Sequence, residues 1–236
     1  MSYDEAAFWG EWEPCETKLS HERYSNSVRL VQHRESGKMA VLKRLMVDDG
    51  SQARYRTNNE VQGYILGSLI GANIPRVDRL DSATVLVDFV EGHTAQQFRG
   101  LVGTAYYPAR VQSYRNDMNA LFDFVANVYD RHRFNCIVHD YMDFWLIDNE
   151  RAFAGIVDCE QFERDSFFGL PWHRESLTTD RVRSAMSAVE ESDLRTTLVE
   201  NSKSWSGYST DLAYRHVMTN FETVIKNLQE RDSLRG

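Results

Sequence analysis

The sequence lacks the features of secreted and membrane-spanning proteins. Its three cysteines, Cys15, Cys136 and Cys159, are odd in number and form no Cys-x-x-Cys pair. Cys136 and Cys159 lie within apolar or strand-like sequence, so we expect buried free thiols in a reducing cytosol. No stretch approaches the roughly 18 apolar residues of a membrane span, and the acidic N-terminus has no signal-peptide pattern. We therefore expect a cytoplasmic protein without a membrane partner.

An excess of positive charge is also missing. The chain has 27 Lys and Arg against 35 Asp and Glu, a net charge of -8, which argues against nucleic-acid binding through a broad basic surface. A local basic pocket for phosphates is compatible with this balance. Hydrophobic and charged shares of 42% and 26% are ordinary for a globular protein, and 236 residues can form one large domain or two small lobes around a cleft.

The first third of the chain is rich in strand patterns. Residues 28–32 and 39–45 read as two strands joined by a turn, and residues 76–80 and 84–90 as two more. Between these pairs, residues 57–71 have apolar side chains at helical spacing. We predict a small β-rich unit that contains one helix.

The remainder is mostly helical. Apolar stripes at helical spacing run through residues 118–129, 181–199 and 210–230. The fold prediction is therefore α+β and two-lobed, with a small antiparallel sheet and one helix in lobe 1–90 and a mostly helical lobe over 91–236. A small ligand would bind in the cleft between them.

Two aspartates in the second predicted lobe each follow a short apolar run. Asp140 follows an apolar strand start, and the apolar pair Ile156 and Val157 ends in Asp158. Two strands that deliver carboxylates to one place suit phosphoryl transfer, where one orients a hydroxyl nucleophile and the other holds the magnesium ion of ATP. The alternative is a β-hairpin with solvated carboxylates, because residues 148–150 are themselves a good turn.

Lys43 lies among apolar neighbours in the second predicted strand. A lysine there costs free energy unless it reaches solvent or finds an anion. Glu60, 17 residues later in the first turns of the helix, is a natural partner, and such a pair aims the lysine at ATP phosphates. The alternatives are a solvated lysine and an acid favoured by the helix dipole.

The turn before the first predicted strand has no glycine, which a phosphate-covering loop usually provides. It contains Ser25, Asn26 and Ser27, which tolerate tight turns and can donate hydrogen bonds. We keep a nucleotide-covering role for this turn as a possibility.

Taken in order, six segments over about residues 20–172 resemble the aminoglycoside phosphotransferase and choline kinase-like branch of the protein kinase-like fold. They are the Ser-Asn loop at 24–28, the lysine strand at 41–43, the glutamate helix at 59–77, the hinge at 86–92, the catalytic loop at 137–148 and the metal-binding segment at 155–160.

The resemblance implies an ATP- and Mg²⁺-dependent enzyme that transfers the γ-phosphate of ATP to a hydroxyl acceptor, a small molecule or a protein. It implies a β-rich nucleotide-binding lobe and a helical lobe that carries the catalytic and metal-binding hairpin. The implied roles are Asp140 as catalytic base, Asp158 as magnesium ligand, Lys43 with Glu60 as phosphate clamp, and Ser25, Asn26, Ser27, Asp88 and Val90 as nucleotide contacts.

The sequence departs from that family at the catalytic loop. The glycine before Asp140 is absent, and Trp145 stands where the family has a metal-binding asparagine. An indole has only an N–H donor, so Asp143 is the nearest oxygen-bearing candidate for a second metal ligand. Alternatively, Asp143 is the base and Asp140 is structural.

Other functions stay open at this point. The departures also fit a nucleotide-binding pseudokinase that acts as a scaffold or regulator, and the short helical lobe fits a minimal protein kinase. Four acidic residues near the end of the resemblance could favour a cationic acceptor or form a solvated loop: Glu160, Glu163, Asp165 and Glu175.

Overall fold

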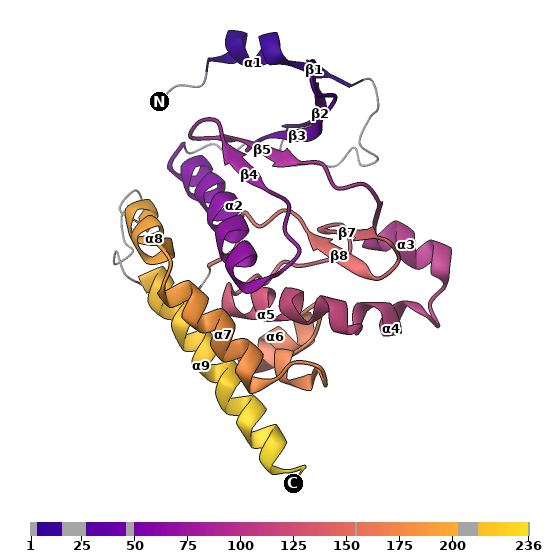
Figure 1. Cartoon of the computed structure of the whole chain (residues 1–236), viewed down its shortest axis with the longest axis vertical. Helices are drawn as coiled ribbons and strands as arrows, with labels where there is room; N and C mark the ends of the chain where they lie inside the picture. Colours follow the sequence, from indigo (N-terminus) through magenta and orange to yellow (C-terminus); the bar gives the residue numbers. More distant parts are fainter. Residues whose placement is uncertain (1–3, 16–26, 46–49, 154, 203–211, 236) are drawn as a thin grey trace.

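The computed structural model describes residues 4–15, 27–45, 50–153, 155–202 and 212–235 (Figure 1). The sheet-rich end begins with α1 (Glu5–Glu11), β1 (Trp12–Pro14), β2 (Ser27–His33), β3 (Met39–Arg44), α2 (Gly50–Ile70), β4 (Val77–Arg79) and β5 (Thr84–Asp88). The rest contains β6 (His93–Thr94), α3 (Ala95–Val102), α4 (Tyr107–Val111), the 3-10 helix η1 (Tyr114–Asn116), α5 (Asp117–Val125), β7 (Cys136–His139), β8 (Asp143–Leu146), α6 (Cys159–Asp165), the 3-10 helix η2 (Pro171–His173), α7 (Thr179–Glu190), α8 (Leu194–Ser202) and α9 (Leu212–Ser233).

The larger sheet is antiparallel, with the strand order β1-β2-β3-β5-β4. Side chains alternate between its two faces. Ala40 and Leu42 of β3 pack with Phe8 of α1 on one face. Lys43 therefore belongs to the opposite face, where the register places it between Val28 and Val85.

Helix α2 packs against both the larger sheet and the helical part of the molecule. It contacts β4 and β5 and also α5, α7 and α8, and its residues Leu66 and Ile70 belong to the core of the helical part. The Thr197 hydroxyl on α8 donates a hydrogen bond to Gln62 Oε1 on α2 at 3.0 Å. The helix that carries Glu60 is thus braced by the C-terminal helices.

A second sheet, with the order β6-β7-β8, lies between the larger sheet and the helices (Figure 1). The hairpin β7–β8 buries alternate side chains, including Val138 and Phe144, in the helical core. Its turn contains Asp140 and Tyr141 with φ of 50° and 61°. At the end of β8, the Leu146 N–H donates to the Asn73 carbonyl at 2.8 Å, which brings the chain back toward α2.

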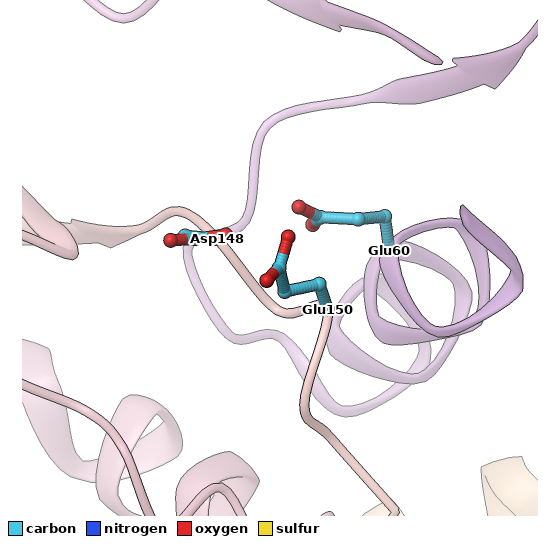
Figure 2. Close-up of side chains that lie close together, drawn as sticks. All are labelled: Glu60, Asp148 and Glu150. Atoms are coloured by element: carbon cyan, nitrogen blue, oxygen red, sulfur yellow. The ribbon is translucent and has the colours of Figure 1, made fainter. Parts of the chain in front are cut away.

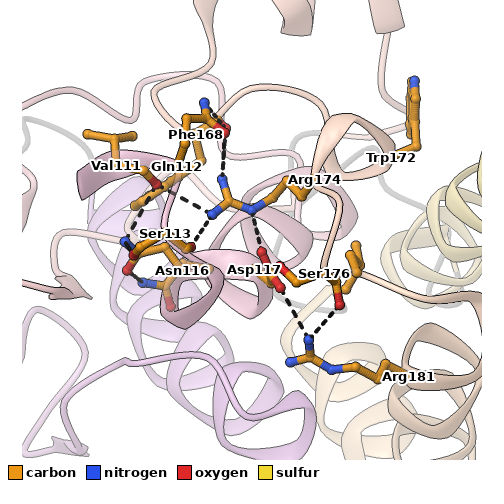
Figure 3. A network of polar contacts seen from close by, with 12 residues as sticks. Val111, Gln112, Ser113, Asn116, Asp117, Phe168, Trp172, Arg174, Ser176 and Arg181 are labelled. Atoms are coloured by element: carbon orange, nitrogen blue, oxygen red, sulfur yellow. Dashed lines mark hydrogen bonds and ion pairs between the residues drawn. The ribbon is translucent and has the colours of Figure 1, made fainter. Parts of the chain in front are cut away.

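Buried Arg174 links several segments of the helical part through hydrogen bonds (Figure 3). Its guanidinium donates to Asp117 Oδ1 at 2.8 Å and to the carbonyl oxygens of Ser113 and Phe168 at 2.6 and 3.3 Å. Arg181 binds the other Asp117 oxygen at 3.2 Å. These bonds fasten the segment after α6 to α5.

The predicted α+β architecture, with an antiparallel sheet first and helices after it, is confirmed. The glutamate helix begins at Gly50, earlier than predicted, and the stripe over 181–199 is divided between α7 and α8. The strand predicted at Ile156 and Val157 is wrong, because these residues form no strand and precede α6. None of the helices in the described ranges is long and apolar enough to cross a bilayer.

Candidate functional site

Lys43 is surrounded by three carboxylates. Its Nζ lies 2.6 Å from Glu60 Oε1 and 3.2 Å from Glu150 Oε2, and it also forms an ion pair with Asp148. Figure 2 shows that Glu60 comes from α2, whereas Asp148 and Glu150 come from the loop after β8. The Glu60 and Glu150 side chains are 3% and 6% exposed, while Asp148 is 36% exposed. Of the three, Asp148 is therefore the one that faces solvent.

The charges in this cluster shift one another's pKa values. Burial alone lowers the pKa of Lys43, but Glu60, Asp148 and Glu150 together raise it above its ordinary value. Burial also works against the charged form of Asp148, but Lys43, with Arg131 and His132, lowers the pKa of that carboxyl. Lys43 and Asp148 are therefore charged at neutral pH.

The loop after β8 is attached to α2 by further bonds. Glu60 Oε2 accepts the Asn149 N–H at 2.9 Å, and Asn59 Nδ2 donates to the Glu150 carbonyl at 3.0 Å. Arg56 Nη1 binds Glu150 Oε1 at 3.0 Å. The position of this loop is therefore set by α2.

The loop between α5 and β7 forms the next part of the site. Buried Arg131 donates to Asp123 Oδ1 at 3.1 Å and to the Asn135 carbonyl at 3.0 Å, and it also binds Asn149 Oδ1. Its guanidinium thus joins the loop before β7 to the loop after β8.

Asp130 precedes this arginine and is half-buried. Arg151 Nε lies 3.4 Å from its Oδ2, and its buried Oδ1 has no hydrogen-bond partner within the described ranges. Burial raises the pKa of Asp130, Arg131 opposes this effect, and the charge of Asp148 adds to it, so the net shift is upward. Asp130 is thus a carboxylate within electrostatic reach of Asp148, with an oxygen left to accept a proton.

Divalent cations suit this donor set. Oxygen atoms of Glu60, Asp148 and Glu150 lie within 4.8 Å of one another, and Mg²⁺ prefers carboxylate and amide oxygens. Lys43 forms ion pairs with all three carboxylates. Half-buried Asp148, the most accessible of the three, is therefore the carboxylate best placed to hold Mg²⁺.

The structure brings Lys43 and Glu60 together but places the predicted aspartates elsewhere. Asp140 is 73% exposed in the hairpin turn, beside its neighbour His139. Asp143 lies 3.3 Å from Arg115, and Asp158 caps α6 by accepting the Gln161 N–H at 3.0 Å.

Among the described residues, no hydrogen bond or ion pair joins Asp140, Asp143 or Asp158 to Lys43 or Glu60. The predicted roles of Asp140 as base and Asp158 as magnesium ligand therefore gain no support from a contact with this pair. The physical reason is the hairpin, because β7 carries the chain away to the turn at Asp140 and β8 returns it to α2 at Asp148. Trp145 belongs to β8 and does not occupy the place of a metal ligand beside Lys43.

Two of the predicted nucleotide contacts, Asp88 and Val90, lie at the end of β5 and just after it. The Asp88 N–H donates to the Arg76 carbonyl at 2.9 Å, and its carboxylate pairs with Lys38 at 2.6 Å. Val90 lies in the connection to β6 and lines a cavity of about 390 Å³. Ser27 begins β2 opposite Arg44, whereas Ser25 and Asn26 lie outside the described residues. The cavity is bounded by residues 74–76, 88–91, His139 and Trp145.

A second cavity, of about 180 Å³, lies beside the Asp130 loop. One side is formed by residues 127–129 and the other by Ile156 and α6. Asp158 and Asp165 both line it. The predicted metal ligand Asp158 thus borders a pocket next to Asp130, without contacting Lys43.

Sequence reasoning missed Asp130, Asn135, Asp148 and Glu150 as site residues. Two signals were present. Asparagine follows aspartate after five residues at Asp130 and Asn135, the spacing that was sought after Asp140. The pattern Asp-x-Glu occurs twice, at 148–150 and 158–160, and the first copy is the one at the lysine.

A five-stranded sheet whose lysine pairs with a helix glutamate, above a helical lobe, is a two-lobed protein kinase-like fold. The chain matches the Rio2 kinase–ADP/Mg²⁺–phosphoaspartate complex from Chaetomium thermophilum with a TM-score of 0.53 and 15% identity, over 96% of this chain and 74% of that one. This likeness concerns the fold. No protein-family model matches the chain, and no curated protein matches it either.

Proposed function

We propose that the protein is an ATP- and Mg²⁺-dependent phosphotransferase that transfers the γ-phosphate of ATP to a hydroxyl acceptor, a small molecule or a protein. The observation that carries this proposal is the buried pair of Lys43 and Glu60 in contact with Asp148. Phosphoryl transfer needs a fixed cation for the phosphates and a carboxylate for the metal. The ADP- and magnesium-bound Rio2 complex supports it as a fold analogue.

In this proposal, Lys43 binds ATP phosphates and Glu60 orients it. Asp148 holds Mg²⁺, and the amide oxygen of Asn135 is the second ligand. The bound ion supplies positive charge that offsets the charge of the phosphates. The backbone at Asp88 and Val90 binds adenine, and the lobes divide near residue 90.

Asp130 is the proposed base. The acceptor oxygen bonds to the γ-phosphorus, the bond to the bridging oxygen of ADP breaks, and the hydroxyl proton passes to Asp130. Its raised pKa favours accepting that proton. The roles predicted for Asp140 and Asp158 pass to Asp130 and Asp148 in this proposal.

We place the protein in the aminoglycoside phosphotransferase and choline kinase-like branch. The support is the order Ile147, Asp148, Asn149, Glu150, which is similar to the metal-binding segment of that branch. Asp130 followed by Asn135 supplies the asparagine, five residues after an aspartate, that is absent after Asp140.

The test compares four variants with the wild type. ATP turnover with purified protein should fall at least about a hundredfold in Asp148→Asn and Asp130→Asn, the size of effect for removing a group that acts in the transition state. Asp158→Asn and Asp140→Asn should stay within about threefold of wild type, because neither contacts Lys43. Loss of turnover in the second pair but not the first would reverse the assignment.

A nucleotide-binding pseudokinase that acts as a scaffold is the second candidate. The ion pair of Lys43 with Asp148 favours it, because it engages both the phosphate-binding cation and the metal-binding carboxylate. ATP binding that is indifferent to Mg²⁺, without phosphate transfer to any acceptor, would support this function.

A further inference from the structure

We propose that Glu150 is a positioning residue: its carboxylate, which is shared between Arg56 and Lys43, is the counter-charge that stays on Lys43 when Asp148 turns to the metal ion. This inference rests on the proposed function, and it concerns how readily the site takes up Mg²⁺.

The geometry places Glu150 between two cations. Its Oε2 lies 3.2 Å from Lys43 Nζ, and its Oε1 lies 3.0 Å from Arg56 Nη1. Arg56 stands on α2 one turn before Glu60. The Glu150 backbone is fixed as well, since its carbonyl accepts Asn59 Nδ2 at 3.0 Å. Glu150 therefore keeps its place whatever Asp148 does.

The three carboxylates on Lys43 are not equivalent. Glu60 and Glu150 are buried, whereas Asp148 is only half-buried and the most accessible to solvent. An ammonium in a buried position needs nearby negative charge. If Asp148 leaves for a metal ion, Glu60 and Glu150 still balance Lys43, and the cost of that movement is small.

Without the charge of Glu150, Lys43 would depend more on Asp148. The lysine would then compete with Mg²⁺ for the same carboxylate. Removing Arg56 should act in the opposite direction, because it leaves Glu150 freer to bind Lys43 and so weakens the hold on Asp148. A purely structural role predicts that both changes harm the site alike.

The experiment is calorimetric titration of ADP at a series of Mg²⁺ concentrations, with thermal unfolding as a check on folding. Glu150→Gln should raise the half-saturating Mg²⁺ concentration about three- to tenfold, where tenfold corresponds to about 1.4 kcal/mol. Arg56→Gln should leave the half-saturating Mg²⁺ concentration unchanged or lower it. Arg181→Gln, which loses an ion pair remote from Lys43, is the matched control and should change nothing.

A charge acting directly on Mg²⁺ would give the same signs, so the lysine is varied too. In a Lys43→Met background, Glu150→Gln should have no further effect, because Glu150 acts through Lys43. A persisting effect overturns the inference, as does an unchanged Mg²⁺ requirement in Glu150→Gln. If Lys43→Met abolishes ADP binding, the Arg56→Gln variant decides instead. A higher half-saturating Mg²⁺ concentration in that variant overturns the inference, and a lower one supports it. Wild-type protein that binds no Mg²⁺–ADP would refute the proposed function instead.

Discussion

The Glu60 carboxylate accepts the backbone N–H of Asn149 at 2.9 Å while its other oxygen lies 2.6 Å from Lys43. One side chain of α2 therefore fixes both the cation and the loop that carries Asp148. The same helix is braced at Gln62 by Thr197 of α8. The pair of Lys43 and Glu60 is thus assembled by packing within the chain.

Replacement of Glu60 by glutamine should damage the site without removing its shape. The amide can still accept the Asn149 N–H, but it removes a buried counter-charge from Lys43. We expect kcat/KM for ATP to fall about a hundredfold, with most of the loss in kcat. Steady-state kinetics measures this. Glu163→Gln, at an exposed residue, is the control, and equal kinetics in both variants would contradict the role of Glu60.

The buried ion pair of Arg131 and Asp123 should dominate local stability. Both side chains are 1% exposed, so removing one leaves the other charged and unpaired. Asp123→Ala should lower the free energy of unfolding by about 3–5 kcal/mol. Glu13→Ala, which breaks the exposed pair with Arg34, should cost under about 1 kcal/mol. Urea unfolding of both variants checks this, and equal losses would show that the buried pair is not special.

Activity should fall in acid at a pH above the ordinary pKa of an aspartate. Burial raises the pKa of Asp130, and a base works only when deprotonated, so kcat/KM is lost as pH falls through that raised value. Arg151 lowers the pKa of Asp130. Arg151→Gln should therefore move the acidic limb to higher pH. A pH–rate profile tests this, with Arg164→Gln as control, and a shift to lower pH would exclude Asp130 as the base.

Local patterns predicted much of the fold. Alternation identified β2 and β3, and helical spacing identified α5, α7 and α9, because these signals lie within a few residues of one another. The pairing of Lys43 with Glu60 was also accessible, since a lysine in an apolar strand needs an anion and Glu60 lies in the first turns of the helix predicted over residues 57–71.

The partner Asp148 was not accessible in this way. It lies 105 residues from Lys43, and its position depends on the length of the β7–β8 hairpin. The sequence offers Asp-x-Glu at 148–150 and at 158–160, and local chemistry does not distinguish them. Only the return of β8 to Asn73 and α2 decides between them.

Gly92, next to the proposed adenine-binding backbone, should not tolerate a side chain. Its φ is +150°, and a Cβ there would overlap the Val138 carbonyl oxygen. Gly92→Ala should lower the free energy of unfolding by about 1–3 kcal/mol. Because the strain falls two residues after Val90, we also expect KM for ATP to rise more than kcat falls.

Gly100→Ala is the matched control: Gly100 lies inside α3 with open space around its Cβ position, so alanine should stabilise the protein by about 0.5–1 kcal/mol. Thermal unfolding and ATP kinetics on both variants separate the two effects, and an unchanged KM in Gly92→Ala would argue against adenine binding at this connection.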